Sequence, residues 1–120
     1  MANLNFDVTS EQNFEMTRGD TFAFGVEMEG NTQELDTAYF TVKKDIDSDA
    51  YVFQKSLEDG ITLVEIGEDS IFYRVRIAPN DTKNLDAGKY FYDLELGLNG
   101  DVFTPIMGIL TLDKDVTRRQ

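Results

Sequence analysis

The sequence predicts an all-β fold, and three observations lead to this prediction. Several stretches alternate apolar and polar residues with period two, which is typical of strands that have one buried face. Turn-forming residues recur about every ten positions, and no stretch repeats its apolar residues with the period of a long helix. Seven to eight short strands spaced in this way predict a β-sandwich or a β-barrel.

The N-terminal part is predicted to contain an arm and two strands. Residues 2–12 are polar with scattered apolar positions, and Phe6 and Val8 either join a first edge strand or contact a partner. A short strand is expected over 13–17. A turn then leads into a longer strand over 21–29, in which every second residue is apolar or aromatic.

The middle of the chain is predicted to form two more strands and an acidic loop. Residues 39–44 alternate and are expected to be a strand, and the loop 45–49 follows. Residues 51–57 predict a weaker strand at an edge, because Lys55 interrupts the alternation. Asp59-Gly60 is a strong turn signal.

The second half contains the clearest strand signals. Strands are expected over 61–66 and 70–78, and residues 79–85 predict a helical turn that begins near a proline. The longest alternation runs over 89–98. An Asn-Gly hairpin turn then leads into a strand over 102–112.

Two features distinguish the last strand and the residues after it. Pro105 and Gly108 indicate an edge position or a bulge in the last strand, and residues 113–120 are charged and predict a frayed tail. The core is expected to contain Phe22, Phe24, Val26, Phe40, Val42, Ile71, Tyr73, Val75, Tyr90, Tyr92, Leu94, Leu96 and Leu110. Residues 1–120 are therefore expected to form a single domain with short flexible N- and C-terminal arms.

Composition limits the classes of function. The net charge of −12 repels nucleic-acid phosphates and anionic lipid headgroups, so neither nucleic acid nor a membrane is an expected partner. The chain has no cysteine and no histidine, which removes disulfides, the usual zinc ligands and the commonest general base. No signal peptide, phosphate-binding loop or serine nucleophile motif is recognisable. We therefore expect that the chain is not an enzyme and that it has no catalytic residue, no cofactor and no metal.

Two short motifs resemble known sites. Arg18-Gly19-Asp20 is the tripeptide that integrin ligands display, but its position between two strands favours an ordinary turn. Asp45-Ile46-Asp47-Ser48-Asp49 resembles the first half of an EF-hand calcium loop. The glycine and glutamate that this loop requires are replaced by Ala50 and Ser56, so a solvated acidic loop is favoured, and a weak divalent-cation site is the alternative.

Three aromatic residues fall on the outward faces of predicted strands: Tyr39, Phe72 and Phe91. They either contact another subunit or are covered by loops, and a sugar-binding platform is a further alternative. On a strongly acidic surface, an aromatic patch favours a protein interface.

The segment Asp86–Tyr92 resembles the Asp-x-Gly/Ala-x-Tyr-x-Cys signature of immunoglobulin-like domains. Tyr90 occupies the position of the corner tyrosine, whose hydroxyl bonds back to the turn backbone. Tyr92 stands where antibody-type domains have a disulfide cysteine. The resemblance implies an immunoglobulin-like β-sandwich of two antiparallel sheets outside the antibody-type group.

A longer series of motifs is similar to the small immunoglobulin-like domains of tailed bacteriophages and prophages, of which the N-terminal domain of baseplate upper proteins is an example. The motifs that carry this resemblance are 17–22, 35–36, 38–44, 59–61, 77–82 and 87–94. In such proteins the domain is an assembly module without catalytic residues.

This resemblance implies a non-enzymatic phage or prophage structural protein, which is a component of the tail, baseplate or head decoration. Its expected partners are other virion proteins, or further copies of itself in a ring-like homo-oligomer. It would be assembled in the bacterial host cytoplasm and located in the virion. One alternative is a carbohydrate-binding or adhesive surface module, and another is a metal-dependent enzyme that uses the acidic loop.

Overall fold

The structure is a computed structural model that describes residues 2–4 and 9–117. The described residues form strands joined by turns and one helical turn. Their bounds are β1 (Ala2–Leu4), β2 (Ser10–Glu11), β3 (Phe14–Thr17), β4 (Phe22–Glu29), β5 (Thr37–Lys43), β6 (Phe53–Leu57), β7 (Gly60–Ile66), β8 (Ser70–Ile77), α1 (Pro79–Thr82), β9 (Gly88–Leu98) and β10 (Asp101–Asp113). The predicted all-β class is confirmed.

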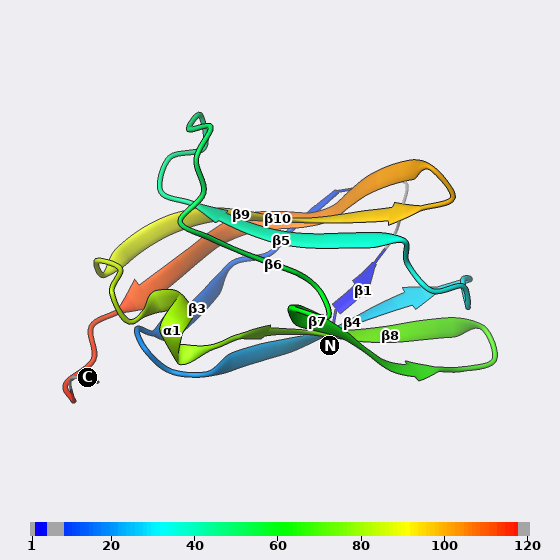
Figure 1. Ribbon diagram of the computed structural model, residues 1–120, viewed down its shortest axis with the longest axis horizontal. Coiled ribbons are helices and arrows are strands. Elements are labelled where there is room, and N and C mark those ends of the chain that lie inside the picture. The colour runs from blue at the N-terminus through cyan, green and yellow to red at the C-terminus, as the bar shows by residue number, and fades with distance from the viewer. Residues whose placement is uncertain (1, 5–8, 118–120) are drawn as a thin grey trace.

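Hydrogen bonding links the ten described strands into one curled, mixed sheet. The strand order is β1-β4-β8-β7-β6-β5-β9-β10-β2, and β3 also pairs with β10. In Figure 1 the sheet folds over itself, so that β5, β9 and β10 form one layer and β4 and β8 lie in the layer opposite. The chain crosses between the layers where β6 and β7 pair in parallel, at Ser56 with Gly60 and at Leu57 with Ile61.

This topology differs from the predicted fold in two ways. We expected two separate antiparallel sheets, whereas the described strands form one sheet with parallel pairs at β1–β4, β6–β7, β10–β2 and β10–β3. The predicted number of seven to eight strands omitted the short strands in the arm. Ala2–Leu4 pairs with β4 and Ser10–Glu11 pairs with β10, because both lie beside strands that leave an edge open.

The core lies between the two layers and follows the predicted alternation. The predicted core residues are buried except Phe22 and Phe24, which are half-buried. These two rings still pack against the core, because Phe24 lies 4.7 Å from Phe14 and 5.7 Å from Phe40 between ring centroids. The contact between Phe24 on β4 and Phe40 on β5 joins the layers.

The turn chemistry of the sequence is also confirmed. Asn99 and Gly100 have φ values of 56° and 84°, as a two-residue hairpin of the Asn-Gly type requires. The predicted helical turn is α1, which begins at Pro79, and the Asp81 carboxylate accepts a hydrogen bond from the Ala78 N–H at 2.7 Å. The irregularity in β10 is a register shift between Phe103 and Ile106, which includes Pro105.

Some predictions for the edges and arms need correction. The strand expected over 51–57 begins at Phe53 and connects the layers, so it is not a free edge along its whole length. Phe6 and Val8 lie outside the described residues. The tail is held at Asp115, whose carboxylate accepts hydrogen bonds from Arg18 at 3.0 and 2.9 Å.

Candidate binding groove

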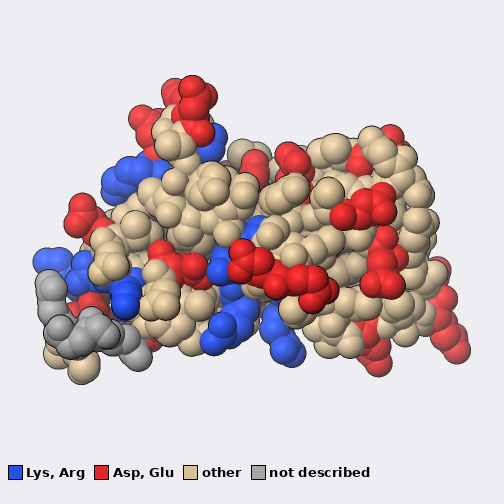
Figure 2. Space-filling model, in the orientation of Figure 1, with Lys and Arg blue, Asp and Glu red and all other residues tan. Residues whose placement is uncertain are grey.

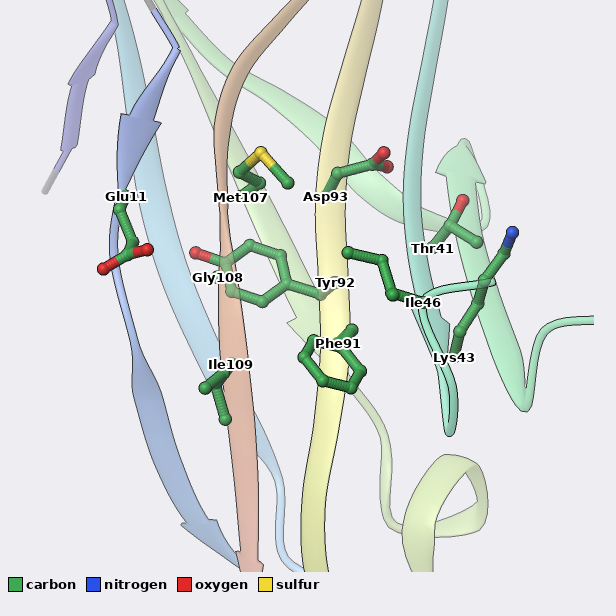
Figure 3. A pocket seen from close by; sticks show the side chains of 10 residues that line it. All are labelled: Glu11, Thr41, Lys43, Ile46, Phe91, Tyr92, Asp93, Met107, Gly108 and Ile109. Atoms are coloured by element: carbon green, nitrogen blue, oxygen red, sulfur yellow. The ribbon is translucent and has the colours of Figure 1, made fainter. Parts of the chain in front are cut away.

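An open groove lies on the outer face of the β5–β9–β10 layer. It has a volume of about 280 Å³ and is lined by Glu11, Thr41, Lys43, Ile46, Phe91, Tyr92, Asp93, Met107, Gly108 and Ile109 (Figure 3). Most of these residues occupy outward positions of β5, β9 and β10. Ile46 comes from the 45–49 loop, which stands above this layer in Figure 1.

Ile46, Phe91, Met107 and Ile109 form an apolar part of the groove. Sheet register places Ile109 opposite Phe91 and Met107 opposite Asp93 on the neighbouring strands. Ile46 and Met107 are exposed, and Phe91 is half-buried. Large apolar side chains held open to solvent on a sheet face are a common feature of protein-binding surfaces.

The polar part of the groove contains the Asp93 carboxylate, which has no hydrogen-bond partner among the described residues. No described residue donates a hydrogen bond to Asp93 or lies within salt-bridge distance of it. Burial raises the pKa of the Asp93 carboxyl above its ordinary value, the negative charge of Glu95 raises it further, and the positive charge of Lys43 opposes both effects. An incoming cation would stabilise the ionised form of this carboxyl.

The Lys43 ammonium, whose positive charge acts on this carboxyl, already has a hydrogen-bond partner elsewhere. The Lys43 ammonium donates a hydrogen bond to the Ser48 carbonyl at 2.7 Å and so holds the 45–49 loop over β5. Glu11 on β2 contributes a second carboxylate to the groove wall. The groove therefore has acidic groups and an apolar floor, and it is suited to a ligand that is both cationic and apolar.

The predicted outward aromatics do not form one platform. Tyr39 on β5 and Phe91 on β9 share the outer face of this layer, where Tyr39 pairs with Glu95 and Phe91 pairs with Lys43. Phe72 lies on β8 in the opposite layer, between Glu27 and Glu65 on its neighbouring strands. Only Phe91 lines the groove.

The Arg18-Gly19-Asp20 segment is a structural turn. The Asp20 N–H donates to the Thr17 carbonyl at 3.1 Å, and Gly19 has a φ of 84°. The Arg18 guanidinium is largely buried, where it pairs with Asp115 and donates to the Leu85 carbonyl at 3.1 Å. It is therefore not displayed for an external receptor.

Local hydrogen bonds account for the conformation of the acidic loop 45–49. Asp45 accepts a hydrogen bond from the Asp47 N–H at 3.1 Å, and Ser48 accepts one from the Ala50 N–H at 3.1 Å, which are typical side-chain turns. Within residues 2–4 and 9–117, no group of three or more acidic, histidine or cysteine residues is placed to hold a metal ion. Figure 2 shows acidic side chains on this loop and spread over much of the visible surface.

The hydroxyls of two tyrosines on the inner face of β9 are hydrogen-bonded within the fold. The Tyr90 hydroxyl donates to the Asp86 carbonyl at 2.7 Å, which is the corner contact predicted from the sequence. The Tyr92 hydroxyl donates to the Gln12 carbonyl at 2.6 Å, so it connects the N-terminal arm to the core. Burial raises the pKa of both hydroxyls above the ordinary value of tyrosine.

Sequence reasoning found Phe91 but missed the groove. The outward positions of two predicted strands did contain apolar residues, Phe91 on one and Met107 and Ile109 on the other. These residues form a groove only because β10 lies beside β9 in a fixed register and because the 45–49 loop places Ile46 over them. The sequence pattern predicts neither the register nor the position of the loop.

Comparisons with known proteins give a fold likeness and no family. No protein-family model and no curated protein match the chain. Part of a family 123 glycoside hydrolase from Clostridium perfringens is similar in structure, with a TM-score of 0.53 and 12% sequence identity over 88% of this chain. The chain spans 23% of the length of that hydrolase. This likeness supports the β-rich fold alone.

Two further structures are more distant. The NK cell receptor Nkp44 matches with a TM-score of 0.46 and 11% identity over 87% of this chain and 99% of its own. A GH5 xyloglucanase of Bacteroides ovatus matches with a TM-score of 0.39 and 11% identity over 84% of this chain and 17% of its own. None of the three is described as a phage protein. No helix in the described part of the chain is long and apolar enough to cross a membrane.

Proposed function

We propose that this chain is a non-enzymatic structural protein of a tailed bacteriophage or prophage, a component of the tail, baseplate or head decoration. It acts through contacts with other virion proteins or with further copies of itself. The motif order of the sequence supports this proposal, because it is similar to assembly modules of such particles.

The observation that carries the proposal is the open groove on the β5–β9–β10 face. Exposed Met107 and Ile46 and half-buried Phe91 lie beside the unsatisfied carboxylate of Asp93, on strands whose inner faces are fully packed. A surface that leaves apolar area and a charged group without partners is better suited to docking a protein than to catalysis.

We propose further that the curled sheet is an immunoglobulin-like β-sandwich whose two sheets correspond to the two layers. The long strands of each layer pair antiparallel, and each parallel pair within a layer includes one of the short strands β1, β2 and β3. The hydrogen bond from Tyr90 to Asp86 supports this assignment, because a tyrosine corner is a hallmark of that fold. Tyr92 takes the cysteine position, and its bond to Gln12 supplies a connection there by other means.

The experiment is to look for the protein in particles. Virions or induced prophage particles from the source strain are purified and analysed by mass spectrometry, and the gene order around the coding sequence is read. The protein is expected in the particles and its gene among virion genes. Its absence from particles, with a gene far from any virion cluster, would overturn the proposal, and binding on a glycan array would favour the carbohydrate-binding alternative.

A further inference from the structure

We propose that the groove binds the C-terminal segment Val116–Arg119 of a second copy of this chain, so that copies associate head to tail. This inference rests on the proposed assembly function and specifies one contact of it. The occupant inserts an apolar side chain over Phe91 and places an arginine beside Asp93.

The groove sets the chemistry of its occupant. Ile46, Phe91 and Met107 offer apolar surface, and Asp93 offers a carboxylate that has no partner among the described residues. The guanidinium of arginine suits this position, because it forms paired hydrogen bonds with a carboxylate and stacks on aromatic faces. Glu11 adds negative charge to the wall of the groove.

The tail supplies that chemistry in a chain that otherwise repels itself. With a net charge of −12, two copies repel each other, and a basic segment on one copy favours its contact with an acidic groove on the other. Val116 is followed by Thr117, Arg118 and Arg119, so one apolar residue stands beside two cations. The Val116 side chain is fully exposed.

The anchoring of the tail favours a contact between copies over one within a copy. Arg18 holds Asp115 by two hydrogen bonds at 3.0 and 2.9 Å, immediately before Val116. In Figure 1 the described C-terminal end of the chain lies below the end of β10, whereas the 45–49 loop, which borders the groove, rises above the sheet. A contact between the tail of one copy and the groove of another is heterologous, and it closes into a ring when the rotation between copies allows it.

The first test measures the mass of the 120-residue protein by analytical ultracentrifugation over a range of concentrations at fixed ionic strength. The wild-type mass is expected to rise with concentration. Asp93→Asn, and separately Arg118→Ser with Arg119→Ser, should each weaken association about tenfold. A wild-type chain that stays monomeric at all concentrations would overturn the inference.

Matched controls separate the contact from general charge effects. Asp101→Asn removes an exposed carboxylate at the β9–β10 hairpin outside the groove, and Lys114→Gln removes a tail cation before the Asp115 anchor. Both should associate like the wild type. Association that weakens equally in the controls would contradict the assigned site.

A mixing experiment distinguishes a contact between copies from folding of the tail onto its own groove. Asp93→Asn retains a working tail, and the double arginine variant retains a working groove. Mixed together, they should form one-to-one pairs that do not grow further, although each associates weakly alone. No pairing in the mixture would overturn the inference, while detection in virions would still support the proposed function.

Discussion

The two faces of β9 differ in how completely the chain satisfies them. On the inner face, Tyr90 and Tyr92 are buried and their hydroxyls donate to backbone carbonyls, and Leu94 and Leu96 pack in the core. The outer face, from the same strand, leaves Phe91 half-buried and Asp93 without a hydrogen-bond partner among the described residues.

We infer from this difference that the inner face of β9 stabilises the fold and that its outer face is available to a partner. A face that is packed and fully hydrogen-bonded contributes to stability, and substitutions there should lower the free energy of unfolding. A face with unsatisfied groups contributes little to stability, and substitutions there should change binding. In the described part of the chain, no buried side-chain polar atom lacks a hydrogen-bond partner, so the unsatisfied groups lie at the surface.

The largest expected effect is on the inner face. Leu94→Ala removes a fully buried side chain from the core and should lower the free energy of unfolding by about 3 kcal/mol. Its neighbour on the outer face provides the matched variant, because Glu95→Ala should change stability by less than about 0.5 kcal/mol. Urea denaturation followed by circular dichroism measures both. Equal losses in the two variants would contradict the distinction between the faces.

A smaller effect is expected where the N-terminal segment runs beside β10. A Cβ atom on Gly108 would overlap the Gln12 carbonyl and approach Asn13, so the arm must move away. Gly108→Ala should therefore cost about 1–3 kcal/mol and expose the first residues to protease. Gly100→Ala is the control for proteolysis, because a Cβ there meets no atom within 4 Å and the strain of its φ of 84° is confined to the β9–β10 hairpin, away from the arm. An arm equally protected in both variants would show that the strands accommodate the methyl group.

The tyrosine hydroxyls are expected to contribute about 1 kcal/mol each. Tyr90→Phe removes the bond to Asp86, and Tyr92→Phe removes the bond to Gln12. Thermal and urea unfolding should show retained folds with lower stability, and only Tyr92→Phe should loosen the N-terminal arm in hydrogen exchange. No loss in Tyr90→Phe would mean that this residue is only a core aromatic, and the tyrosine-corner argument for the fold would fail.

The sequence predicted local structure better than the arrangement of the sheet. Alternation over 89–98 placed Tyr90, Tyr92, Leu94 and Leu96 in the core, and Asn99-Gly100 predicted the correct hairpin, because both signals depend on neighbouring residues. The parallel pairing of Ser56 with Gly60 was not predictable, because it depends on where the chain crosses between layers. The groove was missed for the same reason, since Ile46, Phe91 and Met107 meet only after β5, β9 and β10 align.

The smallest expected effect lies on the outer face and depends on pH. The folded protein raises the pKa of Asp93 above its ordinary value of 3.8, chiefly through burial, so folding favours the protonated carboxyl. The contribution of this group to stability is therefore full below pH 3.8 and is lost as the pH rises through the folded-state pKa. Asp93→Asn cannot ionise, so it should be slightly more stable than the wild type at neutral pH.

This advantage should shrink as the pH falls toward 3.8, because both proteins then carry a neutral side chain at position 93. Urea denaturation of both proteins across this range, at concentrations low enough to keep the chain monomeric, measures the difference and cancels the effect of the other carboxyls. A variant less stable than the wild type at neutral pH would mean that the ionised carboxylate is stabilised within the monomer. Asp93 would then be satisfied within the monomer, like the residues on the inner face of β9, and the reason for assigning a partner to the groove would be removed.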